Sequence, residues 1–184
     1  MKNTLRSLLL TAVTCLMWFN ALSQKLSPEE TSLYEAIMEY RASKGLSEIP
    51  LSRSLTEVAQ THCRDLVENQ PDRGRCNGHS WSDKGKWSPC CYTPDHAKAE
   101  CMWKKPSELT PYEGYGYEIA CGDTECCLDF DMTAKYALES WQGSPGHNSV
   151  IVNLGSWSDN TWRAIGIGIY QCYAVVWFGE DPEY

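Results

Sequence analysis

The sequence predicts a single α/β domain, and two observations carry this prediction. Apolar residues follow helical spacing in the first part of the chain, whereas they alternate as in strands near its end. The length suits one domain with one sizeable core, and an aromatic content of 11% argues against disorder. We therefore expect helices and a sheet to share one compact unit.

Four segments carry helical signals. The run Ser27-Pro28-Glu29-Glu30 is a capping box with a first-turn proline, so a helix begins there. Apolar spacing predicts further helices over about 51–69 and 131–142, and a short helix that includes His147. His62 lies on the inner face of the second helix. We interpret it as a core histidine held by a backbone carbonyl.

Two strands are predicted at the end of the chain, over 162–170 and 172–178. In the first, isoleucines alternate with Gly166 and Gly168. Glycine at every other position of one face indicates that something bulky, an indole or a helix, packs closely against that face.

The segment from Gln70 to Thr110 has neither helical nor strand periodicity. It is rich in Gly, Pro, Ser, Asp, Trp and Cys, which predicts a long ordered loop insert fastened by disulfides. His96 in this insert stands among charged residues and is expected at the surface.

Cysteine is the clearest indicator of compartment. Nine cysteines follow the predicted signal segment: Cys63, Cys76, Cys90, Cys91, Cys101, Cys121, Cys126, Cys127 and Cys172. Their spacings are adjacent or four residues apart instead of the two-residue spacing of thiolate zinc sites, so we predict disulfides. Because nine is odd, one thiol is free, capped or bonded to another chain; the connectivity stays open.

Residues 1–23 have the features of a secretory signal. Lys2 and Arg6 precede an apolar run, and small residues stand where a peptidase would cut before Gln24. A lipid anchor on Cys15 is the competing interpretation. We expect a secreted or periplasmic protein, monomeric and without a membrane span. Loss of the signal takes the formal charge from −8 to −10, which argues against a nucleic-acid partner.

Two histidine segments carry the chemistry. Ser144 is expected to cap the short helix and Pro145 to open it, which places His147 in the first turn, where the helix dipole favours a neutral ring. The run Gly78-His79-Ser80 lies in the loop insert. If the fold brings the two rings together across 68 positions, they form part of a zinc or copper site.

Five motifs resemble, in order, those of the CAP superfamily, which contains cysteine-rich secretory, antigen 5 and pathogenesis-related 1 proteins. The segment at His147 is most similar to the bacterial SCP-like branch. The motifs are Gly78-His79-Ser80, Gly116-Tyr117-Glu118-Ile119-Ala120, Trp141 to His147, Ile165-Gly166-Ile167-Gly168 and Trp177-Phe178-Gly179. The resemblance implies a three-layer α/β/α sandwich with a cleft of two histidines and two acidic residues, which binds a divalent metal in some members.

The resemblance carries over only in part. His79 and His147 match the two family histidines, but Tyr117 stands at the family glutamate and Glu118 at the neighbouring asparagine. Since side chains of a strand alternate, Glu118 is expected to reach the cleft only through a bulge. Ser144 stands where a second acid is expected, and Glu139 would face about 140° away from it on a helix.

Three functions follow. The first is a binding cleft formed by His79 and His147 together with Ser80, Tyr117, Glu118 and Ser144, taking Zn²⁺, a small or lipid-like ligand, or an extracellular protein. The second is a hydrolase with Ser80 or Ser144 as nucleophile and a cleft histidine as base, although the chain lacks a Gly-x-Ser-x-Gly elbow. The third is an interaction scaffold that uses the loop insert over about 70–110. No organic cofactor is expected.

Overall fold

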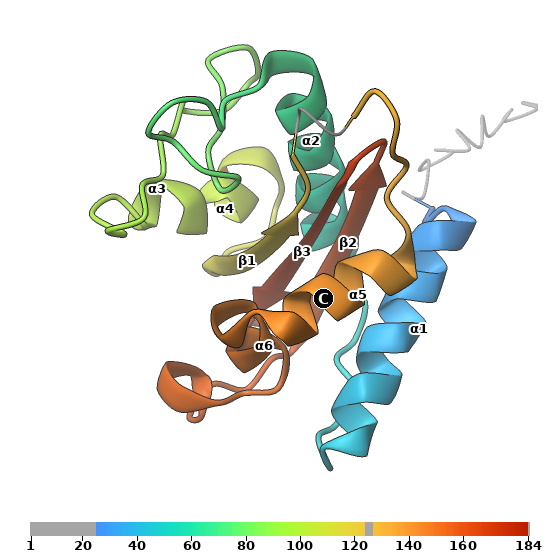
Figure 1. Cartoon of the computed structure of the whole chain (residues 1–184). Helices are drawn as coiled ribbons and strands as arrows, with labels where there is room; N and C mark the ends of the chain where they lie inside the picture. The colour runs from blue at the N-terminus through green and yellow to red at the C-terminus, as the bar shows by residue number, and fades with distance from the viewer. Residues whose placement is uncertain (1–24, 124–126, 184) are drawn as a thin grey trace, which may run out of the picture.

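The computed structural model describes residues 25–123 and 127–183 of the chain. The predicted signal over 1–23 and Cys126 lie outside the described residues. The described part forms a sheet with a helical layer on each face (Figure 1). This is the α/β/α sandwich that the resemblance to the CAP superfamily implies.

The sheet has three antiparallel strands in the order β1-β3-β2. They are β1 (Gly116–Cys121), β2 (Ala164–Tyr170) and β3 (Tyr173–Gly179). The β1–β3 ladder runs without interruption from Gly116 opposite Gly179 to Cys121 opposite Ala174. β1 and β2 are therefore the edge strands of this sheet.

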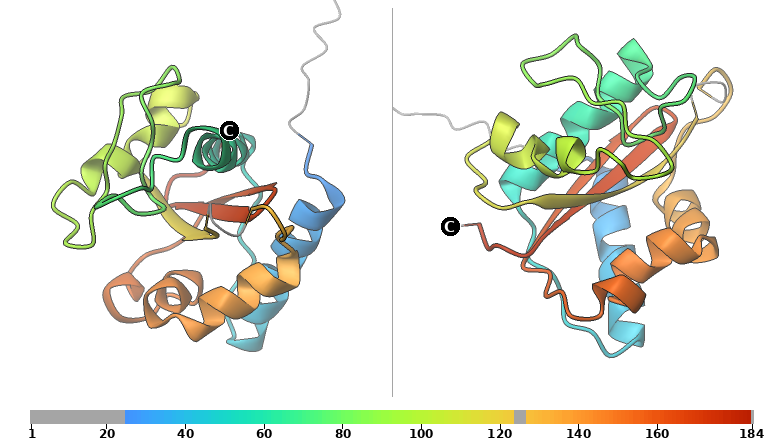
Figure 2. Two further views of the ribbon diagram at one scale, coloured as in Figure 1. Left: turned by 45° about the horizontal axis from the view of Figure 1, so that its top comes forward. Right: turned by 90° about the vertical axis from the view of Figure 1, so that its left-hand side faces the viewer.

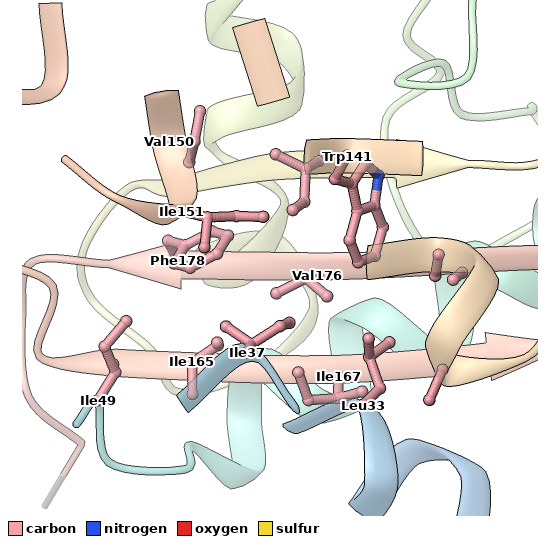
Figure 3. Close-up of a cluster of buried hydrophobic side chains, with 14 of the residues drawn as sticks. Leu33, Ile37, Ile49, Trp141, Val150, Ile151, Ile165, Ile167, Val176 and Phe178 are labelled. Carbon is pink, nitrogen blue, oxygen red and sulfur yellow. The ribbon is translucent and has the colours of Figure 1, made fainter. Parts of the chain in front are cut away.

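One face of the sheet is covered by three helices, α1 (Pro28–Ser43), α5 (Ala134–Gly143) and α6 (Pro145–Ile151). Their apolar side chains meet the sheet in the larger part of the core, where Trp141, Ile151 and Phe178 are fully buried (Figure 3). The expected capping box is confirmed, since Ser27 and Glu30 each accept a hydrogen bond from the other's backbone amide. The capping box of α1 and the apolar spacing of α5 therefore specify two of the three helices in this layer.

The opposite face is covered by α2 (Arg53–Asn69) and by the loop insert (Figure 2). The close approach predicted from alternating glycines is confirmed, because a Cβ at Gly166 would lie 2.0 Å from the backbone carbon of Leu55. At Gly168 the corresponding distance to Ala59 is 2.4 Å. The bulky object is therefore the backbone of α2 itself.

The predicted loop insert is partly helical, which corrects the expectation that this ordered segment contains loop alone. It contains α3 (Glu100–Trp103) and α4 (Lys105–Leu109), each too short to show an apolar period. Trp81 and Cys90 also exchange two backbone hydrogen bonds across the insert.

Three disulfides join described cysteines, as predicted. Two of them lie within the insert, Cys76–Cys91 and Cys90–Cys101, and the third joins Cys127 to Cys172. Of the described cysteines, Cys63 and Cys121 are free, and Cys63 is fully buried on α2. Burial raises the pKa of the Cys63 thiol well above its usual value, so this thiol is chemically inert.

None of the helices over residues 25–123 and 127–183 combines the length and apolar character that crossing a bilayer requires.

Candidate functional site

The two candidate histidines lie beside each other at the end of β1, around a cavity that Ala120 and Cys121 also line. His79 comes from the insert on the α2 side, and His147 comes from α6 on the opposite side of the sheet. Their ring centroids are 6.4 Å apart, with the planes inclined at 69°. The fold therefore joins two residues that are far apart in the sequence.

Both rings line a cavity of about 240 Å³, whose wall also includes Gly78, Ala120, Cys121 and Tyr173. Pockets for drug-sized ligands measure about 300–1,000 Å³. The cavity is therefore large enough for an ion with its waters or for a few-atom ligand, and small for a lipid.

Glu118 lies behind His79, on the face of the sheet that α2 covers. It is paired with Trp177 of β3, and directly paired residues of antiparallel strands project to the same face. Its carboxylate reaches Nδ1 of His79 through Oε1 at 2.7 Å. The bulge expected to bring Glu118 to the cleft is absent from the regular β1–β3 ladder, so that expectation was wrong.

The other carboxylate oxygen of Glu118 contacts His62 of α2. The Oε2–Nδ1 distance is 2.5 Å, and both side chains are buried. Burial alone would raise the pKa of Glu118, but the charge and hydrogen bond of His62 and the hydrogen bond of His79 outweigh it and lower the pKa. Glu118 is therefore a carboxylate at neutral pH and accepts hydrogen bonds from both rings.

The carboxylate determines which nitrogen of His79 faces the cavity with a lone pair. Since Glu118 can only accept, Nδ1 of His79 must carry the proton. In the neutral ring Nε2 is then unprotonated and able to bind a metal or accept a proton.

His147 is held in its neutral form. Burial is the largest cause that lowers its pKa, repulsion from His79 adds to it, and attraction to Glu118 opposes it. The direction agrees with the expectation from the sequence, but the cause differs. Ser144 does occupy the N-cap of α6, yet its side chain makes no capping hydrogen bond, so that expectation was wrong.

The other candidate residues lie outside the cavity wall. Ser80 is fully buried, and its hydroxyl accepts a hydrogen bond from the backbone amide of Tyr92. Tyr117, on the face opposite Glu118, packs against Trp103, Trp157 and Trp162. Ser144 stands at the junction of α5 and α6. The structure therefore brings His79, His147 and Glu118 together and leaves these three apart.

His62 is the site residue that sequence reasoning missed. The prediction of a backbone partner is confirmed, since Nε2 lies 2.9 Å from the carbonyl oxygen of Ser80. Its other nitrogen, however, contacts Glu118. The available signal was a histidine on the inner face of a helix in a chain that also has a displaced glutamate, but only the fold relates the two.

The residues present could hold a metal ion only with help from water. None of the described His, Cys, Asp and Glu side chains gather in a group of three or more around a possible metal position. Two imidazoles on one tetrahedral zinc place their ring centroids about 5 Å apart, so the observed 6.4 Å requires an approach of roughly 1 Å. The donor set fits a two-histidine site whose remaining positions are filled by solvent or ligand.

A larger cavity of about 700 Å³ lies near the start of α2, beside Ser54, Tyr112 and Arg163. Several of its polar groups already have partners within the chain. Glu183 accepts hydrogen bonds from the Ser54 amide and hydroxyl, and the Tyr112 hydroxyl donates to the Asp181 carbonyl. Size alone would favour this cavity, whereas the available donor atoms favour the histidine cleft.

Comparison with models of known protein families matches residues 34–178 to the cysteine-rich secretory protein family, abbreviated CAP. The chain belongs to this family. Comparison with curated protein sequences gives no match. The CAP match spans every residue of the histidine cleft and the described sheet up to Phe178 of β3.

Solved bacterial structures share the CAP fold at low sequence identity. An outer surface protein of Borrelia burgdorferi is 18% identical with a TM-score of 0.54, and the match covers 86% of this chain and 98% of that one. A cysteine-rich secretory protein of Staphylococcus aureus is 16% identical, with a TM-score of 0.50 and coverages of 83% and 38%. An extracellular SCP-domain protein of Bacillus anthracis is 13% identical, with a TM-score of 0.53 and coverages of 86% and 45%.

Proposed function

We propose that this CAP domain is an extracellular binding module whose cleft takes up a divalent transition-metal ion, with Zn²⁺ the leading candidate, through Nε2 of His79 and a ring nitrogen of His147. The disulfides and the extracellular character stated for two of the similar bacterial proteins support the extracellular assignment.

One observation carries the proposal: two imidazoles face one small cavity, and one of them, His147, favours the neutral, metal-binding form. Nδ1 of His79 is bonded to Glu118, and a carboxylate behind a liganding histidine is a common supporting arrangement in metal sites. The pKa of His147 is lowered by burial and by His79. When bound, the metal would supply an electrophilic centre to which a further ligand could attach.

The cavity volume favours an ion over the lipid-like alternative. At about 240 Å³ it falls below the usual range for small-molecule pockets, and a lipid is larger still. The hydrolase alternative has less support, because Ser80 is buried and Ser144 does not line the cavity. The nucleophile that this alternative requires is thus not presented to a substrate.

Calorimetric titration with ZnCl₂ tests the proposal. We expect the wild-type protein to bind one equivalent and His79→Ala/His147→Ala to bind none. His96→Asn is the matched control, because it removes an exposed imidazole of the same insert and asparagine tolerates the positive φ of 57° at that position.

Equal uptake by the wild type and the double variant would show that zinc binds elsewhere. Absence of heat in both would leave the cleft without a metal function.

A further inference from the structure

His62 is fully buried and belongs to none of the family motifs, yet it contacts the cleft from behind. Both ring nitrogens and one ring face are occupied. Nδ1 faces Glu118 at 2.5 Å, Nε2 faces the Ser80 carbonyl at 2.9 Å, and the ring stacks on Trp81 with 4.2 Å between centroids.

These contacts connect His62 to three consecutive residues of the insert. The ring of His79 is hydrogen-bonded to Glu118, which is in turn hydrogen-bonded to His62. The carbonyl of Ser80 accepts a hydrogen bond from His62 directly, and the indole of Trp81 lies parallel to the His62 ring. A single side chain on α2 thus contacts, directly or through Glu118, each of the three residues of the loop segment that presents His79. Irregular segments achieve such precision only when a second layer of contacts holds them.

Hydrogen-bond accounting assigns the protons in this chain of contacts. A carbonyl and a carboxylate only accept, so both nitrogens of His62 must donate, and His62 is an imidazolium beside the Glu118 carboxylate. Burial opposes this charge on His62, but attraction to Glu118 and the hydrogen bonds from its ring outweigh burial and raise its pKa.

We propose that His62 is the positioning residue of the cleft: acting through Glu118 and the Ser80 carbonyl, it holds His79 in the tautomer that presents an unprotonated Nε2 to the cavity. This inference rests on the proposed function only in assigning a metal-binding purpose to that tautomer. The tautomer of His79 itself can be measured without any metal.

The test is a long-range ¹H–¹⁵N NMR correlation on histidine-labelled, metal-free protein at neutral pH, which reads the protonated nitrogens of each ring. In the wild type we expect His79 to carry its proton on Nδ1 and His62 to carry protons on both nitrogens. A wild-type His79 protonated on Nε2 overturns the proposal, whatever the variants do.

Two variants separate positioning from packing. His62→Phe keeps a ring that can stack on Trp81 but removes both hydrogen bonds, so we expect His79 to shift toward the Nε2-protonated tautomer and zinc affinity to fall about 10–100-fold. His62→Gln retains donor groups and is expected to recover part of both properties. His96→Asn should leave the tautomer of His79 unchanged.

An unchanged His79 tautomer in folded His62→Phe overturns the proposal. If that variant does not fold, the wild-type spectrum and His62→Gln decide the question. If the wild type binds no zinc, the proposed function fails, and the tautomer still decides the role of His62.

Discussion

At the scale of single residues, the central feature is a carboxylate shared by two imidazoles. Glu118 accepts from His62 on one oxygen and from His79 on the other. Either histidine alone would leave one oxygen of a buried anion unpaired, which costs considerable free energy. The fold therefore gains both a satisfied buried charge and a cleft histidine of defined orientation.

The His62–Glu118 pair makes stability depend on pH in two directions. The raised pKa of His62 gives a contribution that is complete below its unfolded value and lost as pH rises through the folded value. The lowered pKa of Glu118 gives a contribution that is present above its unfolded value and lost as pH falls. The pair should therefore stabilise the fold most between about pH 4.5 and 6.5.

Urea unfolding of the wild type and Glu118→Gln from about pH 3 to pH 9 measures this effect. Glutamine can donate to a neutral His62 and accept from His79, so it is a matched replacement without the charge. We expect the difference in unfolding free energy to peak inside the window and shrink on both sides. A difference that stays constant with pH would contradict the ion-pair assignment.

The cleft residues differ in how well the sequence alone could predict them. His79 and His147 could be chosen from local motifs, because Gly78 before the first and Pro145-Gly146 before the second indicate a defined backbone. The contact between Glu118 and His62 could not be derived from the sequence. The alternation of side chains along a strand shows which face of the sheet a side chain lies on, but it does not show which residue packs against that face. Here the face presents His62, a partner that only the packing of α2 on the sheet supplies.

At the scale of elements, the two predicted end strands, α1, α2 and α5 were predictable because each carries a strong period or cap. The strand β1 lacked a clear period of its own, and α3 and α4 are shorter than one apolar repeat. The alternating glycines predicted that a bulky neighbour packs closely against β2, but they did not identify that neighbour as the backbone of α2.

Gly168→Ala tests this packing. A Cβ there would lie 2.4 Å from a backbone carbon of α2, and neither backbone can move without disturbing the core. We expect a loss of unfolding free energy of at least about 1–3 kcal/mol, measured by urea unfolding.

Gly143→Ala is the control for this substitution. It lies at the end of α5 with no atom within 4 Å of the added Cβ, so stability should stay the same or rise by up to about 1 kcal/mol. Equal behaviour of the two variants would show that the sheet and α2 are not in close contact.

At the scale of the whole molecule, disulfides link segments of the described chain that lie at different separations in the sequence. The Cys127–Cys172 bond closes 45 positions, whereas Cys90–Cys101 closes 11. Since the entropy removed from the unfolded chain grows with loop length, the longer link should contribute more.

Paired substitutions test this order. We expect Cys127→Ala/Cys172→Ala to lower the unfolding free energy by about 1 kcal/mol more than Cys90→Ala/Cys101→Ala, on a loss of about 2–5 kcal/mol for either. Each pair includes one buried cysteine, Cys172 or Cys90, so packing losses are similar. The reverse order would indicate that native packing, and not loop closure, dominates.

The adjacent cysteines of the insert have a consequence for how the protein matures. Cys90 and Cys91 bond to different partners, and Trp81 pairs with the backbone of Cys90 beside the histidine segment. Neighbouring side chains of an extended segment project in opposite directions, so exchanging the two partners would turn this segment over. A misoxidised chain would have the native mass and the native number of bridges, yet its histidine cleft would be unassembled.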